Sequence, residues 1–152
     1  MSTVDLTAGT FEQTLTEHPI VLVDWWASWC GPCKMFAPVY AAAAEQHTDI
    51  VFGKVDTEAE QSLAAGAQIT SIPTIMAFRD GLLLFAQPGA LPASALEELI
   101  GKVRDLDMDE VHAQVAQTHQ EAGAQQQADA QQEDDGAGGG EGGGDLAEQE
   151  QG

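Results

Sequence analysis

The sequence predicts an α/β domain built on a mixed β-sheet with helices on both of its faces. Short apolar runs alternate with segments of helical composition, and a hairpin signal joins the last two apolar runs. Strands that are joined through helices run parallel, whereas strands joined by a tight turn run antiparallel, so one sheet is expected to contain both kinds of pairing. A sharp change of composition near Thr118 ends the part of the chain that can build a core.

The expected elements follow one another in a regular order. Strands are expected at residues 20–26, 50–55, 74–78 and 82–86, and helices at residues 33–46, 58–65 and 93–106. The last two strands flank Arg79-Asp80-Gly81, which is a typical hairpin turn. A short helix over residues 108–117, with Asp107 as its cap, is expected to prolong the preceding helix or to follow it.

Composition divides the chain into three parts. Residues 1–106 are expected to form the folded domain and residues 107–118 a helical extension, while residues 119–152 are acidic and rich in Gly and Gln. Leu146 is the only large aliphatic residue after residue 118, so this last segment cannot bury enough apolar surface to offset the entropy of ordering it. We therefore expect a disordered tail, for which a solubilising role is favoured over specific docking.

The charge balance excludes several classes of partner. The chain contains 25 Asp and Glu but only five Lys and Arg, which gives a net charge of -20. Such a surface repels phosphate backbones and anionic lipid, so neither nucleic acid nor a membrane is an expected partner. The first residues contain neither a basic start nor an apolar run, and no segment is long enough to span a bilayer. We therefore expect a cytoplasmic, monomeric protein.

The chemistry of the chain is expected to lie at Cys30 and Cys33. In a reducing cytosol, such a closely spaced pair is more often a redox or metal site than a structural staple. The pair follows a predicted strand and opens a predicted helix, where unpaired N–H groups and the helix dipole stabilise an anion. The pKa of a thiol in this type of site can fall from about 8.5 to about 7. Cys30 is therefore the expected nucleophile, and Cys33, expected to be more buried, would resolve the mixed disulfide.

Half of a zinc site is the competing interpretation of this cysteine spacing. The sequence contains no second cysteine pair, and its histidines are scattered instead of being spaced as ligands. They are His18, His47, His112 and His119. We therefore expect neither a metal nor a cofactor.

The segment around the cysteines resembles the active site of the thioredoxin family. Residues 23–35 read Val-Asp-Trp-Trp-Ala-Ser-Trp-Cys-Gly-Pro-Cys-Lys-Met and match that family almost throughout, with Trp25 where the family often has Phe. The resemblance covers residues 3–106 in the same order and continues through Pro38, Lys54, Ile72-Pro73-Thr74, Gly81 and Gly89-Ala90. It implies a thioredoxin fold, with a mixed central sheet of about five strands and helices on both faces.

The resemblance also implies roles for individual residues. Asp24 would help to deprotonate Cys33 and Lys54 would modulate its charge, whereas the residues alone also allow a strand-end polar residue and a surface lysine. Burial within an apolar strand is itself expected to raise the pKa of Asp24. Pro73 would follow a cis peptide bond beside the dithiol. The implied docking surface around Cys30 consists of Trp29, Gly31, Pro32, Ile72, Pro73 and Gly89.

The implied function is the reduction of disulfides in cytosolic proteins through a reversible Cys30–Cys33 dithiol/disulfide pair. Electrons would come from an NADPH-dependent thioredoxin reductase, and the clients would be disulfide-containing proteins. The Gly-Pro pair between the cysteines resembles the reducing branch of the superfamily. Two alternatives stay open: a binding module with an incidental dithiol, and an oxidase or isomerase. The lack of a signal peptide argues against an oxidase or isomerase, because such a protein needs an oxidising compartment.

Overall fold

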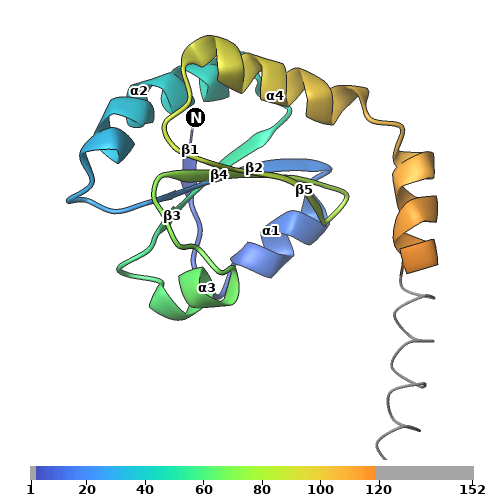
Figure 1. The fold of residues 1–152 in the computed structure, drawn as a ribbon, viewed down its shortest axis with the longest axis horizontal. Coiled ribbons are helices and arrows are strands. Elements are labelled where there is room, and N and C mark those ends of the chain that lie inside the picture. Colours follow the sequence, from blue (N-terminus) through green and yellow to red (C-terminus); the bar gives the residue numbers. More distant parts are fainter. Residues whose placement is uncertain (1–2, 119–152) are drawn as a thin grey trace, which may run out of the picture. The chain divides into compact units, whose positions relative to one another are not determined.

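The computed structural model describes residues 3–118. The chain divides after Asp105 into two units. The first unit contains the sheet and its four helices (Figure 1). Residues 119–152, for which a disordered acidic tail is expected, lie outside the described residues.

One mixed sheet of five strands organises the first unit, in the order β1-β3-β2-β4-β5. The strands are β1 (Thr3–Asp5), β2 (Ile20–Trp26), β3 (Val51–Asp56), β4 (Thr74–Arg79) and β5 (Leu82–Pro88). The β1–β3 and β3–β2 pairs are parallel, whereas the β2–β4 and β4–β5 pairs are antiparallel. The predicted fold class is therefore confirmed.

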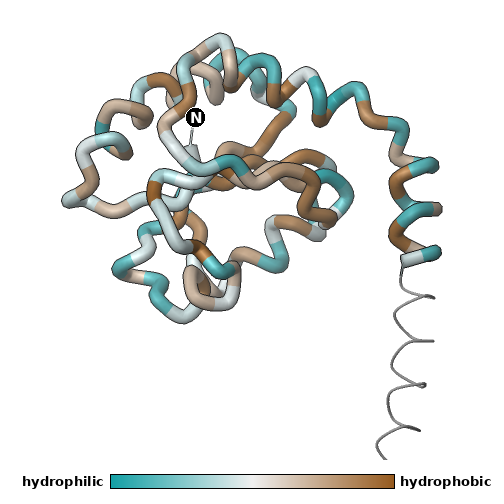
Figure 2. Tube along the Cα trace, in the orientation of Figure 1, coloured by the Kyte–Doolittle hydropathy of each residue, from teal (hydrophilic) through white to brown (hydrophobic). Residues whose placement is uncertain are grey.

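Four helices cover the sheet: α1 (Phe11–Glu17), α2 (Gly31–Gln46), α3 (Gln61–Gly66) and α4 (Ala93–Asp105). Figure 1 shows α2 and α4 above one face of the sheet and α1 and α3 below the other. Two apolar cores result, one on each face of the sheet. Figure 2 shows that apolar residues gather on the central strands.

The central position of β2 explains its composition. Six of its seven residues are buried, because helices cover both faces of the strand and both sets of alternating side chains are removed from water. Leu22 belongs to the core under α2 and α4, whereas Val23 belongs to the core over α1 and α3. Since side chains alternate along a strand, Asp24 lies on the same face as Leu22, beneath α2.

Residues 3–19 contain two elements that the sequence did not reveal, β1 and α1. Helix α3 also begins at Gln61 instead of residue 58. The intervening turn is held by other hydrogen bonds, because the Thr57 N–H donates to the Trp26 carbonyl (2.9 Å) and the Glu58 N–H donates to Asp56 Oδ1 (2.9 Å). These bonds hold Thr57 and Glu58 against the ends of β2 and β3, so α3 begins at Gln61.

In the second unit, a helix covers residues 108–118. Asp107 caps its N-terminus, since its Oδ1 accepts hydrogen bonds from the N–H groups of Asp109 (3.1 Å) and Glu110 (3.3 Å). Within residues 3–118, no helix combines the length and the apolar character that crossing a membrane requires.

Candidate active site

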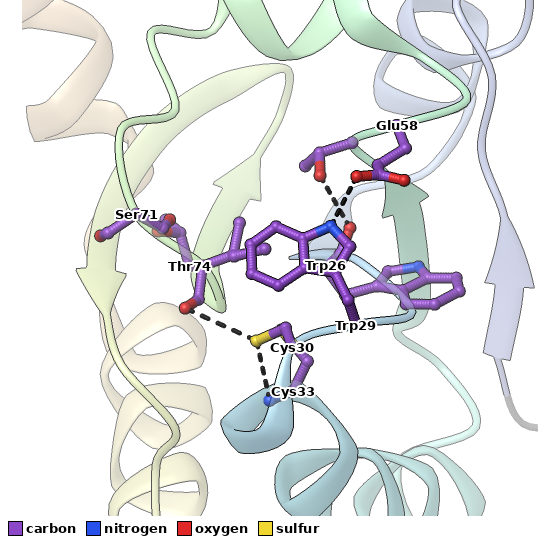
Figure 3. Close-up of a disulfide and its surroundings, with 9 residues drawn as sticks. Trp26, Trp29, Cys30, Cys33, Glu58, Ser71 and Thr74 are labelled. Carbon is purple, nitrogen blue, oxygen red and sulfur yellow. Dashed lines mark hydrogen bonds between the residues drawn. A yellow bond between two sulfur atoms is a disulfide. The ribbon is translucent and has the colours of Figure 1, made fainter.

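Cys30 and Cys33 are joined by a disulfide at the N-terminal end of α2 (Figure 3). Their Cα atoms lie 5.3 Å apart. Cys30 is the N-cap residue, and its Sγ accepts a hydrogen bond from the N–H of Cys33 at 3.2 Å. Pro32 occupies the first turn, where its missing N–H leaves no helical hydrogen bond unmade. The same N–H and the helix dipole favour an anionic sulfur at Cys30 once the disulfide is reduced.

The expectation that Cys33 is more buried than Cys30 is wrong, because each residue is only 4 % exposed. Cys30 is covered by a segment that arrives from far along the chain. Its Sγ lies 3.8 Å from the carbonyl oxygen of Ile72, and Ile72 and Trp26 pack against the cluster that contains both cysteines. The position of Cys30 at the start of a helix could not reveal this long-range cover.

The loop before β4 contains two of the predicted docking residues, Ile72 and Pro73, and a third, Gly89, follows β5. The peptide bond between Ile72 and Pro73 is cis, as the resemblance implied. The Gly89 N–H donates to the carbonyl of Pro73 at 2.8 Å, and Gly89 has a φ of +98°, a conformation that favours glycine. Across the loop, the Thr74 hydroxyl donates to the Ser71 carbonyl at 2.6 Å. Ile72 thus lies against Cys30, and Gly89 lies against Pro73.

Trp29 forms the other side of this surface. Its side chain is 65 % exposed, which is unusual for a large apolar residue, and its indole N–H donates to the carboxylate of Glu58 at 2.5 Å (Figure 3). A hollow of about 220 Å³ lies beside it and is lined by Trp29, Thr57 and Ile72 among others. Gly31 has open space around it, since an added Cβ would meet nothing within 4 Å. The surface around Cys30 is therefore open and mostly apolar.

Asp24 lies on the face of β2 that α2 covers and is 1 % exposed. Neither oxygen of its carboxyl group has a hydrogen-bond partner in the described part of the chain. Burial raises its pKa to about 7, and the positive charge of Lys54 opposes this rise. The expected increase in the pKa of Asp24 is therefore confirmed.

Lys54 is the direct neighbour of Asp24 in the parallel β2–β3 ladder. Its Nζ lies 5.0 Å from the centroid of the Trp26 ring, which is the geometry of a cation–π contact. Trp26 in turn packs against the cluster of the two cysteines, whereas Trp25 is fully buried in the opposite core. The structure thus connects Lys54 to the disulfide through Trp26.

Across residues 3–118, no group of three or more His, Cys, Asp and Glu side chains is placed so that it could hold a metal ion.

A cavity of about 540 Å³ lies between α1, α3 and the β4–β5 hairpin, but neither cysteine of the disulfide lines it.

The arrangement can carry out one kind of chemistry. A cysteine pair that closes a disulfide at a helix N-terminus, beneath an open apolar surface and above a buried acid, can exchange its disulfide with that of another molecule. The fold and the site together define a thiol-disulfide oxidoreductase.

Comparisons with known proteins give the family. The thioredoxin family model matches residues 2–102. The putative thioredoxin 2 of Streptomyces coelicolor is 57% identical over 122 residues, which cover 80% of this chain and 91% of that protein. Thioredoxin 1 of Synechococcus elongatus is 44% identical over 99 residues, which cover 64% of this chain and 92% of that protein.

Solved structures agree with the sequence comparisons. Plasmodium falciparum thioredoxin aligns with a TM-score of 0.62 and 35% identity, over 66% of this chain and 98% of that one. A mutant thioredoxin from Halobacterium salinarum aligns with a TM-score of 0.65 and 31% identity, over 69% of this chain and 93% of that one. The chain therefore belongs to the thioredoxin family, whose members are protein-disulfide oxidoreductases with a redox-active cysteine pair.

Two residues, Glu58 and Tyr40, were missed by reasoning from the sequence. Glu58 was assigned to a helix, and nothing in the sequence pairs it with Trp29. Tyr40 lies on the buried face of α2 and is fully buried. A signal for Tyr40 did exist, because Cys33, Phe36 and Tyr40 follow one another at helical spacing and therefore share one face of the helix.

Proposed function

We propose that this protein reduces disulfides in cytosolic client proteins and is itself reduced by an NADPH-dependent thioredoxin reductase. Family members are reduced by thioredoxin reductase and act on disulfide substrates. The observation that carries the proposal is the Cys30–Cys33 disulfide at the start of α2, beside the loop that contains cis-Pro73. The Gly31-Pro32 pair between the cysteines supports the reducing direction.

In the first step, the thiolate of Cys30 attacks one sulfur of the client disulfide. A bond forms between Cys30 Sγ and that sulfur, the client disulfide breaks, and the second client sulfur leaves as a thiolate. The N–H of Cys33 and the dipole of α2 stabilise the attacking anion, because both point at the sulfur of Cys30.

In the second step, the ionised Asp24 takes the proton from the thiol of Cys33, and the resulting thiolate attacks Cys30. The Cys30–Cys33 disulfide forms, the mixed disulfide breaks, and the client sulfur leaves as a thiolate that takes up a proton. Two electrons have then passed from the dithiol to the client. A pKa of about 7 suits Asp24 for this proton exchange near neutral pH. Lys54 adjusts the charge of Asp24 from the neighbouring strand.

The client docks on the surface formed by Trp29, Gly31, Pro32, Ile72, Pro73 and Gly89. The exposure of Trp29 and the contact between Ile72 and Cys30 support this assignment. The backbone of Ile72 offers an edge to an extended client segment. A surface with few polar side chains selects little for one sequence, so we expect broad specificity toward protein disulfides.

We propose a cytoplasmic location and a monomeric state. Because the net charge of -20 repels nucleic acid and anionic membranes, we propose that neither of them is a partner. Neither a metal nor a cofactor takes part in the proposed cycle, since electrons enter and leave through sulfur.

The proposal is tested by coupling the full chain to NADPH, thioredoxin reductase and insulin as the client disulfide. We expect NADPH consumption by the native chain, and at most background consumption by Cys30→Ser and by the variant with both cysteines replaced by serine. Circular dichroism confirms that the variants are folded. A folded native chain that does not turn over, together with a double variant that still binds the client, would instead establish a binding module.

A further inference from the structure

Glu58 lies beside the docking surface and contacts its exposed tryptophan. Glu58 Oε2 accepts a hydrogen bond from the indole N–H of Trp29 at 2.5 Å, and both side chains are exposed. A carboxylate has about four lone-pair positions, so one N–H donor leaves it able to accept further hydrogen bonds. A client segment that covers the ring of Trp29 therefore passes directly beside a negative charge.

The segment after β3 holds Glu58 in this place. The Glu58 N–H donates to Oδ1 of Asp56, the last residue of the strand, at 2.9 Å. The N–H and the hydroxyl of Thr57 both donate to the carbonyl of Trp26, at 2.9 Å and 3.0 Å. Because the backbone is bound to the ends of β2 and β3 and the carboxylate is bound to the indole of Trp29, the charge has a defined position.

The charge of Glu58 is not neutralised by the protein itself. Glu58 forms no ion pair with another residue in the described part of the chain. All described residues that line the hollow of about 220 Å³ beside Trp29 are uncharged. The basic residue next to the cysteines in the sequence, Lys34, is exposed on another element, α2. The Trp29 side of the docking surface therefore presents an unpaired negative charge to a client.

We propose that Glu58 is a specificity-determining residue, whose carboxylate favours clients with a basic side chain beside the reacting disulfide over clients with an acidic one. A basic side chain next to the client cysteine pairs with the carboxylate, whereas an acidic one is repelled by it. The inference rests on the proposed function, because it requires clients to dock on the surface that contains Trp29. It adds a charge preference to a surface that otherwise selects little for one sequence.

Glu58→Gln separates the charge of Glu58 from its hydrogen bond to Trp29. The amide oxygen of glutamine still accepts the indole N–H, while the negative charge is removed. The indole ¹H–¹⁵N resonance of Trp29 shows by NMR that the hydrogen bond is kept.

Glu45→Gln is the matched control, because it removes the same charge at a distant place. Glu45 is exposed in the last turn of α2, roughly 18 Å beyond Cys33 at about 1.5 Å of rise per residue. This distance exceeds the Debye length of about 8 Å at physiological ionic strength.

The test uses two synthetic disulfide-linked peptides that differ only in the residues flanking the cysteine, which are Lys in one peptide and Glu in the other. The full chain is reduced, freed of reductant and mixed with each peptide, and the second-order rate constant of peptide reduction is measured on quenched samples. The flanking charges also alter the reactivity of the peptide disulfide itself. Because this effect is the same for every variant, the inference is tested by how the Lys-to-Glu ratio of rate constants changes between variants.

We expect this ratio to be roughly 2- to 5-fold lower in Glu58→Gln than in the native chain, because an exposed ion pair contributes about such a factor. Glu45→Gln should keep the native ratio. The difference between the native chain and Glu58→Gln should shrink at 1 M NaCl, where the Debye length is about 3 Å.

Three results would overturn the inference and leave the proposed function standing. The first is an unchanged ratio in Glu58→Gln, and the second is an equal fall in Glu45→Gln, which would assign the preference to the net charge of the chain. The third is a parallel loss of both rate constants in Glu58→Gln at an unchanged ratio, which would give Glu58 a purely structural role at Trp29. A folded native chain that reduces neither peptide would overturn the proposed function, and this inference with it.

Discussion

Asp24 and Lys54 are direct neighbours in the β2–β3 ladder, yet the ammonium of Lys54 lies over the ring of Trp26 and not on the carboxyl group. Neither carboxyl oxygen of Asp24 has a hydrogen-bond partner in the part of the chain that the structure describes. Desolvation consequently outweighs the attraction of Lys54, and the pKa of Asp24 rises from 3.8 to about 7. This buried acid thus keeps its proton under conditions where an exposed aspartate would be ionised.

This raised pKa predicts that Asp24→Asn stabilises the protein at alkaline pH. Between pH 4 and 7 the folded state holds a proton on Asp24 that the unfolded state has lost, so the native chain loses stability as the pH rises. The shift of about 3 pKa units corresponds to about 4 kcal/mol. Asparagine does not titrate, so the variant should match the native chain near pH 4 and exceed it by up to this amount at pH 8. Urea unfolding at both pH values measures the difference, and an equal difference at both would contradict the expectation.

The exposed Trp29 predicts a loss of client affinity in Trp29→Ala. A large side chain in a docking surface typically contributes about 1 to 2 kcal/mol, so KM for a protein disulfide should rise roughly 5- to 30-fold. The rate with a small soluble disulfide and the stability to urea should change little, because Trp29 is 65 % exposed. Steady-state kinetics with insulin and with a small disulfide give the comparison. Equal losses with both substrates would show that Trp29 supports the disulfide itself instead of the client.

Two glycines predict opposite effects of the same substitution. An added Cβ at Gly53 would collide with the side chain of Leu6, so Gly53→Ala should lower the free energy of unfolding by about 1 to 3 kcal/mol. Gly101 lies inside α4, and a Cβ there would meet nothing within 4 Å. Gly101→Ala should therefore stabilise the protein by up to about 1 kcal/mol, since alanine favours helix more than glycine does. Thermal unfolding of the two variants measures both signs, and a stabilised Gly53→Ala would refute the packing of β3 against Leu6.

Local patterns in the sequence were sufficient to predict the elements that consist of long, buried apolar runs. β2 lies at the predicted residues 20–26, because helices on both faces of the sheet leave it no polar positions except Asp24. β1 was missed since it has only three residues, none of them buried, and so shows no pattern from which a strand could be recognised. α1 is short as well, and only two of its residues, Phe11 and Leu15, are buried.

The redox pair could be predicted from its motif, but the surroundings of the pair could not. Cys30 is covered by Ile72, and Trp29 is held by Glu58, through contacts between residues 42 and 29 positions apart. Such contacts depend on how the strands are ordered in the sheet, which local periodicity does not encode. Glu58 is of this kind, whereas the buried position of Tyr40 could have been read from its helical spacing with Cys33 and Phe36.

The central claim is that Cys30 attacks the client and Cys33 releases it. Its most direct test is to mix reduced Cys33→Ser with a disulfide-containing client and to measure the intact mass without reductant. We predict a covalent adduct through Cys30 that dithiothreitol releases, and no adduct with Cys30→Ser under the same conditions. An adduct that accumulates with Cys30→Ser and not with Cys33→Ser would contradict the account, because it would assign the attack to Cys33.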